Sequence, residues 1–173
     1  MNYKRWNELQ EKANSNEVIE GTVKSIKPYG AFIETKNGIV GLLPIEDMCI
    51  SRIRTPYDRF QIGDEVQVKV KEMDDKRQRV TFTHKELLGS WEENAKKMAE
   101  GMKTVGIVRE KEKNKNGIFI ELEPNLVGMA EYDETMEYGQ KVDVYVKKII
   151  PEKRKIKLVI LKEKGAKLDV SND

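Results

Sequence analysis

Short runs in which apolar and polar residues alternate cover most of this chain. Val66, Val68 and Val70 alternate with polar residues, a period of two that places one set of side chains in a core and the other in water. Similar runs predict five strands in the first half of the chain, over residues 18–26, 30–35, 38–43, 65–73 and 79–84. Asn37 and Gly38 form a hairpin signal between the second and third strands. Strands this short and this close together are typical of an all-β barrel or sandwich.

The second half of the chain repeats the first. Residues 21–42 and 106–129 share six positions: Gly21, Val23, Phe32, Ile33, Glu34 and Gly41 match Gly106, Val108, Phe119, Ile120, Glu121 and Gly128. Residues 63–70 recur in the same way at 139–146, whereas eleven residues near 49–60 have no counterpart. A pattern that recurs at this period predicts two tandem copies of one small β unit.

Each unit has its own leading helix. Trp6 precedes Gly21 by fifteen residues, as Trp91 precedes Gly106, and each tryptophan begins an apolar stripe at helical spacing. A Ser-x-x-Glu capping box starting at Ser90 predicts a helix over about 89–100. Because aromatic residues on such stripes mostly pack against a core, we interpret both tryptophans as packing residues rather than as residues that stack on nucleotide bases.

These elements divide the chain into five parts. They are an N-terminal helix at 1–16, a first barrel domain at 17–86, a linker helix at 87–101, a second barrel domain at 102–162 and a C-terminal tail at 163–173. We expect the linker helix to pack closely enough that it is not a free tether.

Composition narrows the class of protein. The chain has 173 residues, of which 36% are charged and 38% hydrophobic, and its formal net charge is +2, so any basic surface must be local. Its apolar runs are only strand-length, and the first ten residues lack the apolar core of a signal peptide. A single cysteine, Cys49, excludes an internal disulfide. We therefore expect a soluble cytoplasmic protein with no membrane partner, and a monomer.

No catalytic group can be assembled from the titratable residues. The single histidine, His84, ends a strand, and Cys49 lies in a loop. Neither a nucleophile with its base nor a metal-ligand spacing is present, so we expect no enzyme activity, no metal and no cofactor.

The second predicted strand carries the side chains that suggest a binding site. Ala31 and Ile33 have the core parity, so Phe32 must point outward together with Glu34, and Tyr29 lies just before it. Two exposed aromatic rings form a platform on which nucleotide bases stack, each base contributing roughly 1–3 kcal/mol. The alternative is that the loop at 48–60 covers Phe32.

Several glycines and their neighbours carry a family resemblance. The order Gly21-Thr22-Val23, Tyr29-Gly30-Ala31-Phe32-Ile33, Gly41-Leu42, Gly63-Asp64, Asp74 and Arg79-Val80 resembles the RNA-binding repeat of bacterial ribosomal protein S1. The resemblance covers nearly all of residues 17–86 and, more weakly, the framework of 102–162. It implies a five-stranded oligonucleotide-binding (OB) fold barrel for each unit, with the ligand on the face of strands two and three. The expected fold class is therefore all-β with short helices: two tandem OB barrels, each preceded by a short α-helix.

The same resemblance implies an RNA surface made of Tyr29, Phe32, Asp74 and Arg79. This chain departs from the family pattern at Pro44, where a histidine is usual, and at Glu46, where a serine is common. The second unit departs further. When the two units are aligned, Asn116 takes the place of Tyr29, Glu131 that of Pro44 and Ile150 that of Asp74. Phe119 and Lys155 alone keep the residue character that the family pattern leads us to expect. We therefore expect the first unit to be the main RNA reader.

Local basic residues extend this candidate surface. Lys24 and Lys27 flank the aromatic platform, and the loop found only in the first unit adds Arg52, Arg54 and Arg59. Lysines and one arginine between 147 and 157 give the second unit a basic cluster of its own, which is equally well explained as a solvated surface.

Together these features predict a protein that binds single-stranded RNA, either messenger or ribosomal, and acts in translation as a ribosome- or messenger-associated factor. One alternative is a protein-interaction adaptor, in which the second barrel, with Glu121, Glu123 and Glu131, docks on a ribosomal or polymerase partner. The other is an accessory factor in transcription or RNA turnover.

Overall fold

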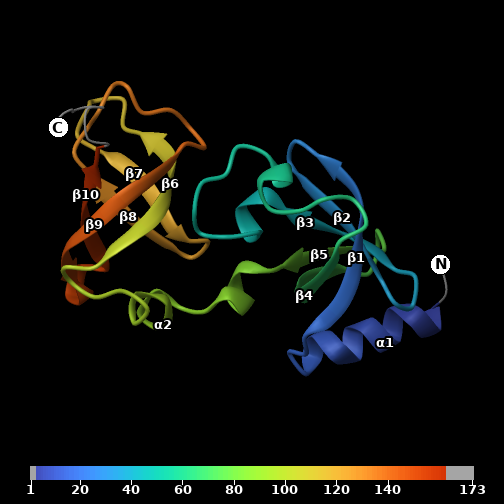
Figure 1. Cartoon of the computed structure of the whole chain (residues 1–173). Coiled ribbons are helices and arrows are strands. Elements are labelled where there is room, and N and C mark those ends of the chain that lie inside the picture. Colours follow the sequence, from blue (N-terminus) through green and yellow to red (C-terminus); the bar gives the residue numbers. More distant parts are fainter. Residues whose placement is uncertain (1–2, 163–173) are drawn as a thin grey trace. The chain divides into compact units, whose positions relative to one another are not determined.

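Two closed five-stranded barrels make up the computed structural model of the chain, which describes residues 3–162 (Figure 1). The chain divides into two compact units between Leu88 and Gly89. In each barrel the strands, counted in their order along the chain, follow the closed order first, second, third, fifth, fourth. The predicted fold class is confirmed. The predicted tail at 163–173 lies outside the described residues.

The first unit begins with a helix, α1 (Tyr3–Asn14). Its strands are β1 (Ile19–Lys27), β2 (Gly30–Thr35), β3 (Val40–Pro44), β4 (Glu65–Asp74) and β5 (Arg79–Thr83). The predicted strand limits agree with these bounds to within two residues. Two single-turn helices, η1 (Ile45–Asp47) and η2 (Pro56–Asp58), lie between β3 and β4, and a third, η3 (Lys85–Leu88), follows β5. In the predicted hairpin Gly38 has φ +87°, and the Thr35 amide donates to the Ile39 carbonyl at 2.8 Å.

Strand β1 closes the first barrel by pairing with two neighbours. Its first half is antiparallel to β4, its second half is antiparallel to β2, and a register shift between Val23 and Ser25 lets the strand bend from one to the other. Gly21 lies where the strand changes partner, and a Cβ atom there would come within 2.5 Å of Ile33 Cγ2. A Cβ atom on Gly106 in the second barrel would come equally close to Ile120 Cγ2, at 2.3 Å. The lack of space explains why both copies have glycine at this position.

The core of the first unit contains the tryptophan of α1. Trp6 and Leu9 are buried against barrel residues that include Val23, Ile33 and Phe82. The indole Nε1 of Trp6 donates to Asp75 Oδ1 at 2.8 Å. The interpretation of Trp6 as a packing residue is therefore confirmed.

The second unit begins with helix α2 (Trp91–Ala95). Its strands are β6 (Lys103–Lys111), β7 (Ile118–Glu123), β8 (Leu126–Ala130), β9 (Lys141–Ile150) and β10 (Lys155–Leu161), with a turn of helix, η4 (Pro151–Lys153), before the last. The core contains Val108, Ile120 and Val144, and Trp91 packs against it from α2. Trp91 is thus also a packing residue.

Helix α2 starts where the sequence predicts and ends earlier. The Ser90 hydroxyl accepts from the Glu93 amide at 3.0 Å, and the Glu93 carboxylate accepts from the Ser90 amide at 2.8 Å, so the capping box is present. The expected end near residue 100 is wrong, because the helix stops at Ala95. The Gly101 amide donates to the Val146 carbonyl at 2.8 Å, and the residues between leave the helix so that the chain can reach the edge of β9.

Candidate nucleic-acid interface

The outer face of β2, β3 and β5 is the candidate site of the first barrel. Phe32 of β2 lies opposite Leu42 of β3, which in turn lies opposite Thr81 of β5. Partners in register point to the same side of a sheet, and Ala31 and Ile33 on either side of Phe32 are fully buried. Phe32 is half-buried on the outer face, so the prediction that it points outward is confirmed and the loop at 48–60 does not bury it.

Tyr29 stands beside Phe32 on this face. Its side chain is 54% exposed, and the two ring centroids are 6.3 Å apart with planes at 89°, an edge-to-face arrangement. The turn that carries Tyr29 is fixed, because the Ile45 amide donates to the Tyr29 carbonyl at 2.9 Å. We call Tyr29 and Phe32 the aromatic pair, and it presents ring surface that a nucleotide base can stack on.

Charged groups flank the aromatic pair on both sides. Lys24 forms an exposed ion pair with Glu34, its Nζ 3.3 Å from Oε1, and Lys27 is exposed opposite Gly30 at the end of β1. Arg79 is exposed two residues before Thr81, so it shares the face of Phe32 at the end of the sheet away from Tyr29. Lys27 thus lies near the Tyr29 end of this face, whereas Lys24, paired with Glu34, and Arg79 lie toward the other end.

Asp74 and Arg79 are directly opposite each other in β4 and β5. Asp74 accepts a hydrogen bond from the Arg77 amide at 3.1 Å and lies 4.0 Å from the Arg77 guanidinium. Asp74 therefore shapes the turn that presents Arg79. Asp74 thus has a structural role in the β4–β5 turn, which the sequence resemblance did not imply.

The loop found only in the first barrel carries three arginines. Arg52 lines a shallow pocket of about 380 Å³ together with Ile45 and Glu46 of η1. Further along the loop, η2 packs against β1, and Arg59 is the residue that follows η2. The structure thus places Arg52 beside η1 and Arg59 on the β1 side, with Arg54 between them in the chain.

His84 and Cys49 have structural partners in the first unit. The His84 ring nitrogen Nδ1 is hydrogen-bonded to the Gln67 carbonyl at 2.6 Å, and its ring lies edge-on to Phe60 with centroids 5.4 Å apart. Cys49 is buried, and its thiol donates to the Ser51 carbonyl at 3.2 Å. Both side chains are thus explained by packing and hydrogen bonding.

The second barrel presents the equivalent face with different chemistry. Phe119 of β7 lies opposite Met129 of β8, which lies opposite Lys157 of β10. Lys157 thus takes the central place that Thr81 has in the first barrel. Asn116, which aligns with Tyr29, is exposed and supplies no ring. The sequence grouped Lys157 only with the surface lysines, and the strand register is the signal that identifies its central place.

A groove of about 820 Å³ follows the junction of β8 and β10 in the second barrel. We call it the β8–β10 groove. Apolar side chains and an outer rim of cations line it, and the residues that matter below are Asn116, Phe119, Met129, Glu131, Asp133, Lys147, Arg154, Lys155, Lys157, Val159 and Lys162. The predicted site residues Phe119 and Lys155 are brought together in this groove.

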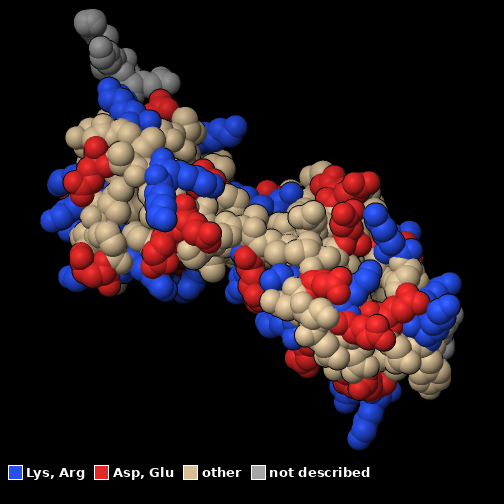
Figure 2. All heavy atoms as spheres, turned by 90° about the horizontal axis from the view of Figure 1, so that it is seen from below, with Lys and Arg blue, Asp and Glu red and all other residues tan. Residues whose placement is uncertain are grey.

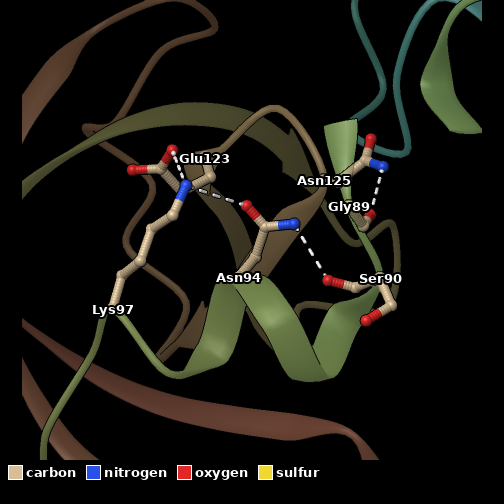
Figure 3. Close-up of polar contacts among 6 residues, drawn as sticks. All are labelled: Gly89, Ser90, Asn94, Lys97, Glu123 and Asn125. Atoms are coloured by element: carbon tan, nitrogen blue, oxygen red, sulfur yellow. Dashed lines mark hydrogen bonds and ion pairs between the residues drawn. The ribbon is translucent and has the colours of Figure 1, made fainter. Parts of the chain in front are cut away.

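Most of the acidic groups expected on the face of the second barrel are engaged elsewhere. Glu121 is 6% exposed, and its carboxylate accepts a hydrogen bond from Arg109 Nε at 3.0 Å. The Glu123 carboxylate accepts one from Lys97 Nζ at 3.4 Å. The same lysine reaches Asn94 of α2, so Glu123 helps to hold that helix (Figure 3). Of the three glutamates that suggested a protein-docking surface, Glu131 alone lines the groove.

Asp133 at the edge of the groove is neutralised by a neighbour. The hydrogen bond from Lys162, with Nζ at 2.8 Å, and those from Thr135 lower the pKa of the Asp133 carboxyl to about 2. The Asp133 carboxyl is therefore ionised at neutral pH, and its ion pair with Lys162 adds little net charge to the groove.

Charge is mixed over the rest of the surface. Figure 2 shows one face on which basic and acidic side chains are interspersed over both barrels, without a continuous basic field. No helix in the described part of the chain is long and apolar enough to cross a membrane. Residues 3–162 contain no group of three or more His, Cys, Asp or Glu side chains arranged to hold a metal ion.

The sequence has clear relatives among ribosomal proteins. Residues 12–85 match the family model described as the S1 RNA binding domain. The small ribosomal subunit protein bS1 of Rhizobium meliloti is 31% identical over 164 residues, and that of Coxiella burnetii is 32% identical over 169 residues. These matches cover 87% and 90% of this chain but 28% and 29% of the relatives, so the chain spans less than a third of their length.

Solved structures match parts of the chain. A chain in the a/eIF2alpha-aDim2p-rRNA complex of Pyrococcus horikoshii is 25% identical with a TM-score of 0.40, covering 47% of this chain and 49% of that one. GSP13 of Bacillus subtilis has the same identity and TM-score over 43% of this chain and 58% of its own. Residues 12–85, which contain the first barrel, therefore match the S1 RNA binding domain family, and the chain over most of its length is similar to part of bS1.

Proposed function

We propose that this protein binds single-stranded RNA and acts in translation, as a ribosome- or messenger-associated factor of the bacterial cytoplasm. The observation that carries the proposal is the aromatic pair, two outward rings of which Phe32 lies on β2 and Tyr29, more than half exposed, lies in the turn before it. Soluble proteins seldom leave neighbouring rings exposed on a sheet without a partner, and stacked bases are the partner that such a pair accommodates best. The bS1 relatives support the ribosomal setting.

The first barrel is the main RNA reader in this proposal. Bases stack on Tyr29 and Phe32, while Arg79 and Lys27 contact phosphates at either end of the face. Pro44 and Glu46 lie at the Tyr29 end, where a carboxylate repels phosphate and can accept a hydrogen bond from a base amino group. The protein acts by binding and not by catalysis.

Binding to bare RNA tests the proposal. The full chain is titrated with a fluorescent twelve-nucleotide single strand and with the duplex of the same sequence. We expect the single strand to bind tighter, because bases in a duplex are already stacked on each other. Equal affinity for both forms would contradict recognition by stacking. Crosslinking in cells, followed by sequencing of the bound RNA, separates translation from transcription or RNA turnover.

A further inference from the structure

The β8–β10 groove differs from the face of the first barrel at its centre. Lys157 follows the alternation of β10, in which Ile156 and Leu158 are buried, so its side chain points outward. It lies opposite Met129, in the row that begins with Phe119. Lys155, two residues earlier, points to the same side. Two lysines therefore follow one strand along the groove.

The cations in the groove are not balanced by the acids in it. Arg154 is paired with Glu92 at 2.9 Å, and Lys162 is paired with Asp133. In the part of the chain that the structure describes, no carboxylate lies within ion-pair distance of the three remaining cations, Lys147, Lys155 and Lys157. One acid, Glu131, faces these three lysines, so the groove carries a local positive charge that suits an anionic chain.

The groove lacks the aromatic pair of the first barrel. Phe119 is its one ring at a position matching that pair, and Asn116 replaces the other. A second ring in the groove, that of Tyr132, is half-buried against the core and lies 5.9 Å from Lys111 Nζ. The rest of the floor is aliphatic, with Met129 half-buried and Val159 42% exposed. Such a floor can support the apolar faces of sugars and bases, but it has few groups that read base edges.

We propose that the β8–β10 groove binds the sugar–phosphate backbone of single-stranded RNA without reading its bases, with Lys157 as the central phosphate contact and Lys155 and Lys147 beside it. The proposal rests on the proposed RNA-binding function and adds a second mode of recognition to it. Stacking dominates in the first barrel, whereas ionic contact dominates in the second. Backbone contacts release counterions, so this part of the affinity falls steeply with salt and is the same for different base sequences.

Salt dependence of the full chain provides the test. Twelve-nucleotide oligo(U), oligo(A) and oligo(C) are titrated between 50 and 200 mM salt against wild type and Lys155→Ala/Lys157→Ala. Each lost phosphate contact lowers the slope of log affinity against log salt by about 0.7, so the double variant loses about 1.4. Wild type should therefore lose about 7-fold more affinity than the variant over this fourfold salt range, with each oligonucleotide.

Two further variants serve as controls. Lys103→Ala/Lys141→Ala removes the same charge from exposed strand positions of the same barrel that do not line the groove, and its slope should stay within about 0.3 of the wild-type slope. Lys155→Arg/Lys157→Arg keeps the charge and should keep the slope.

The outcomes separate this proposal from the one on which it rests. If wild type binds none of the three oligonucleotides, both proposals are wrong. If wild type binds and the groove variant has the same slope as the control variant, the backbone-binding groove alone is wrong. A loss of affinity confined to one of the three oligonucleotides would show that the groove reads bases, and would also overturn the proposal.

Discussion

The two barrels share one framework and differ at the positions that point away from it. In each, a register shift bends the first strand between its two partners, at Val23/Ser25 and at Val108/Glu110. Equivalent hydrogen bonds fix the long loop, from Gly63 to the Val23 carbonyl at 2.8 Å and from Gly139 to the Val108 carbonyl at 2.7 Å. The outward row is Phe32–Leu42–Thr81 in one barrel and Phe119–Met129–Lys157 in the other. Backbone geometry and core are thus retained, while a lysine replaces a threonine in the outward row of the second barrel.

One matched ion pair shows how far the outer faces have diverged. Lys24 and Glu34 in the first barrel are exposed by 53% and 36%, and their atoms are 3.3 Å apart. Their counterparts in the second barrel, Arg109 and Glu121, are exposed by only 5% and 6% and are 3.0 Å apart. The Arg109 guanidinium also lies 5.3 Å from the centroid of the Tyr138 ring. The same sequence positions therefore supply a solvated surface pair in one unit and a buried structural pair in the other.

The largest effect on RNA affinity should come from removing the aromatic pair. Tyr29→Ala/Phe32→Ala deletes two stacking rings worth roughly 1–3 kcal/mol each, so affinity for a short single-stranded RNA should fall about 30-fold or more. The barrel should remain folded in circular dichroism, because both rings lie outside the core. Tyr3→Ala is a matched control, since Tyr3 is 73% exposed on α1. Unchanged affinity in a folded double variant would rule out the stacking mechanism.

Removing one partner of each ion pair should lower the free energy of unfolding much more in the second barrel than in the first. Arg109→Ala leaves Glu121 buried without its cation and should cost about 3–5 kcal/mol, whereas Lys24→Ala should cost less than about 1 kcal/mol. Urea denaturation followed by tryptophan fluorescence measures the free energy of unfolding of each unit. In Trp6→Phe protein the remaining tryptophan, Trp91, reports on the second unit, and in Trp91→Phe protein Trp6 reports on the first. Equal costs would mean that the Arg109 pair is not buried in solution.

The separated halves should differ in RNA affinity. Residues 89–173 lack the aromatic pair and should bind a short single-stranded RNA about 10-fold or more weakly than residues 1–88 at 150 mM salt, because stacking persists under conditions that screen ionic contacts. Anisotropy titrations of both halves measure this, with circular dichroism to establish that each half is folded. If residues 89–173 bound as tightly, the assignment of the main reader to the first barrel would be incorrect.

The smallest effect should come from Arg79. Arg79→Ala removes one phosphate contact beside the stacking face, so the salt slope should fall by about 0.7, which is roughly a 2.6-fold change between 50 and 200 mM. Arg77→Ala, next to the same turn, is the control, because Arg77 is held near Asp74. A slope that drops equally in both variants would mean that Arg79 acts through general charge and not through a specific contact.

Local patterns were sufficient for most of the fold. Alternating valines, the Asn37-Gly38 turn and the Ser90 capping box each depend on neighbours within a few residues, so the sequence predicted the strands and the start of α2. The end of α2 could not be predicted in this way. The chain leaves the helix after Ala95 and is then hydrogen-bonded from Gly101 to Val146, a residue far away in the sequence.

The candidate site divides in the same way. The outward direction of Phe32 followed from its parity with Ala31 and Ile33, because a strand alternates its side chains by geometry alone. The central place of Lys157 and the burial of Glu121 against Arg109 followed only from the pairing of strands. The hydrogen bond from Trp6 to Asp75, which is 69 residues away, likewise could not be read from the local pattern. Local alternation in the sequence is enough to show which side chains leave the core. Which of them meet follows from the folded structure, because cross-strand register and burial depend on segments that the local pattern does not connect.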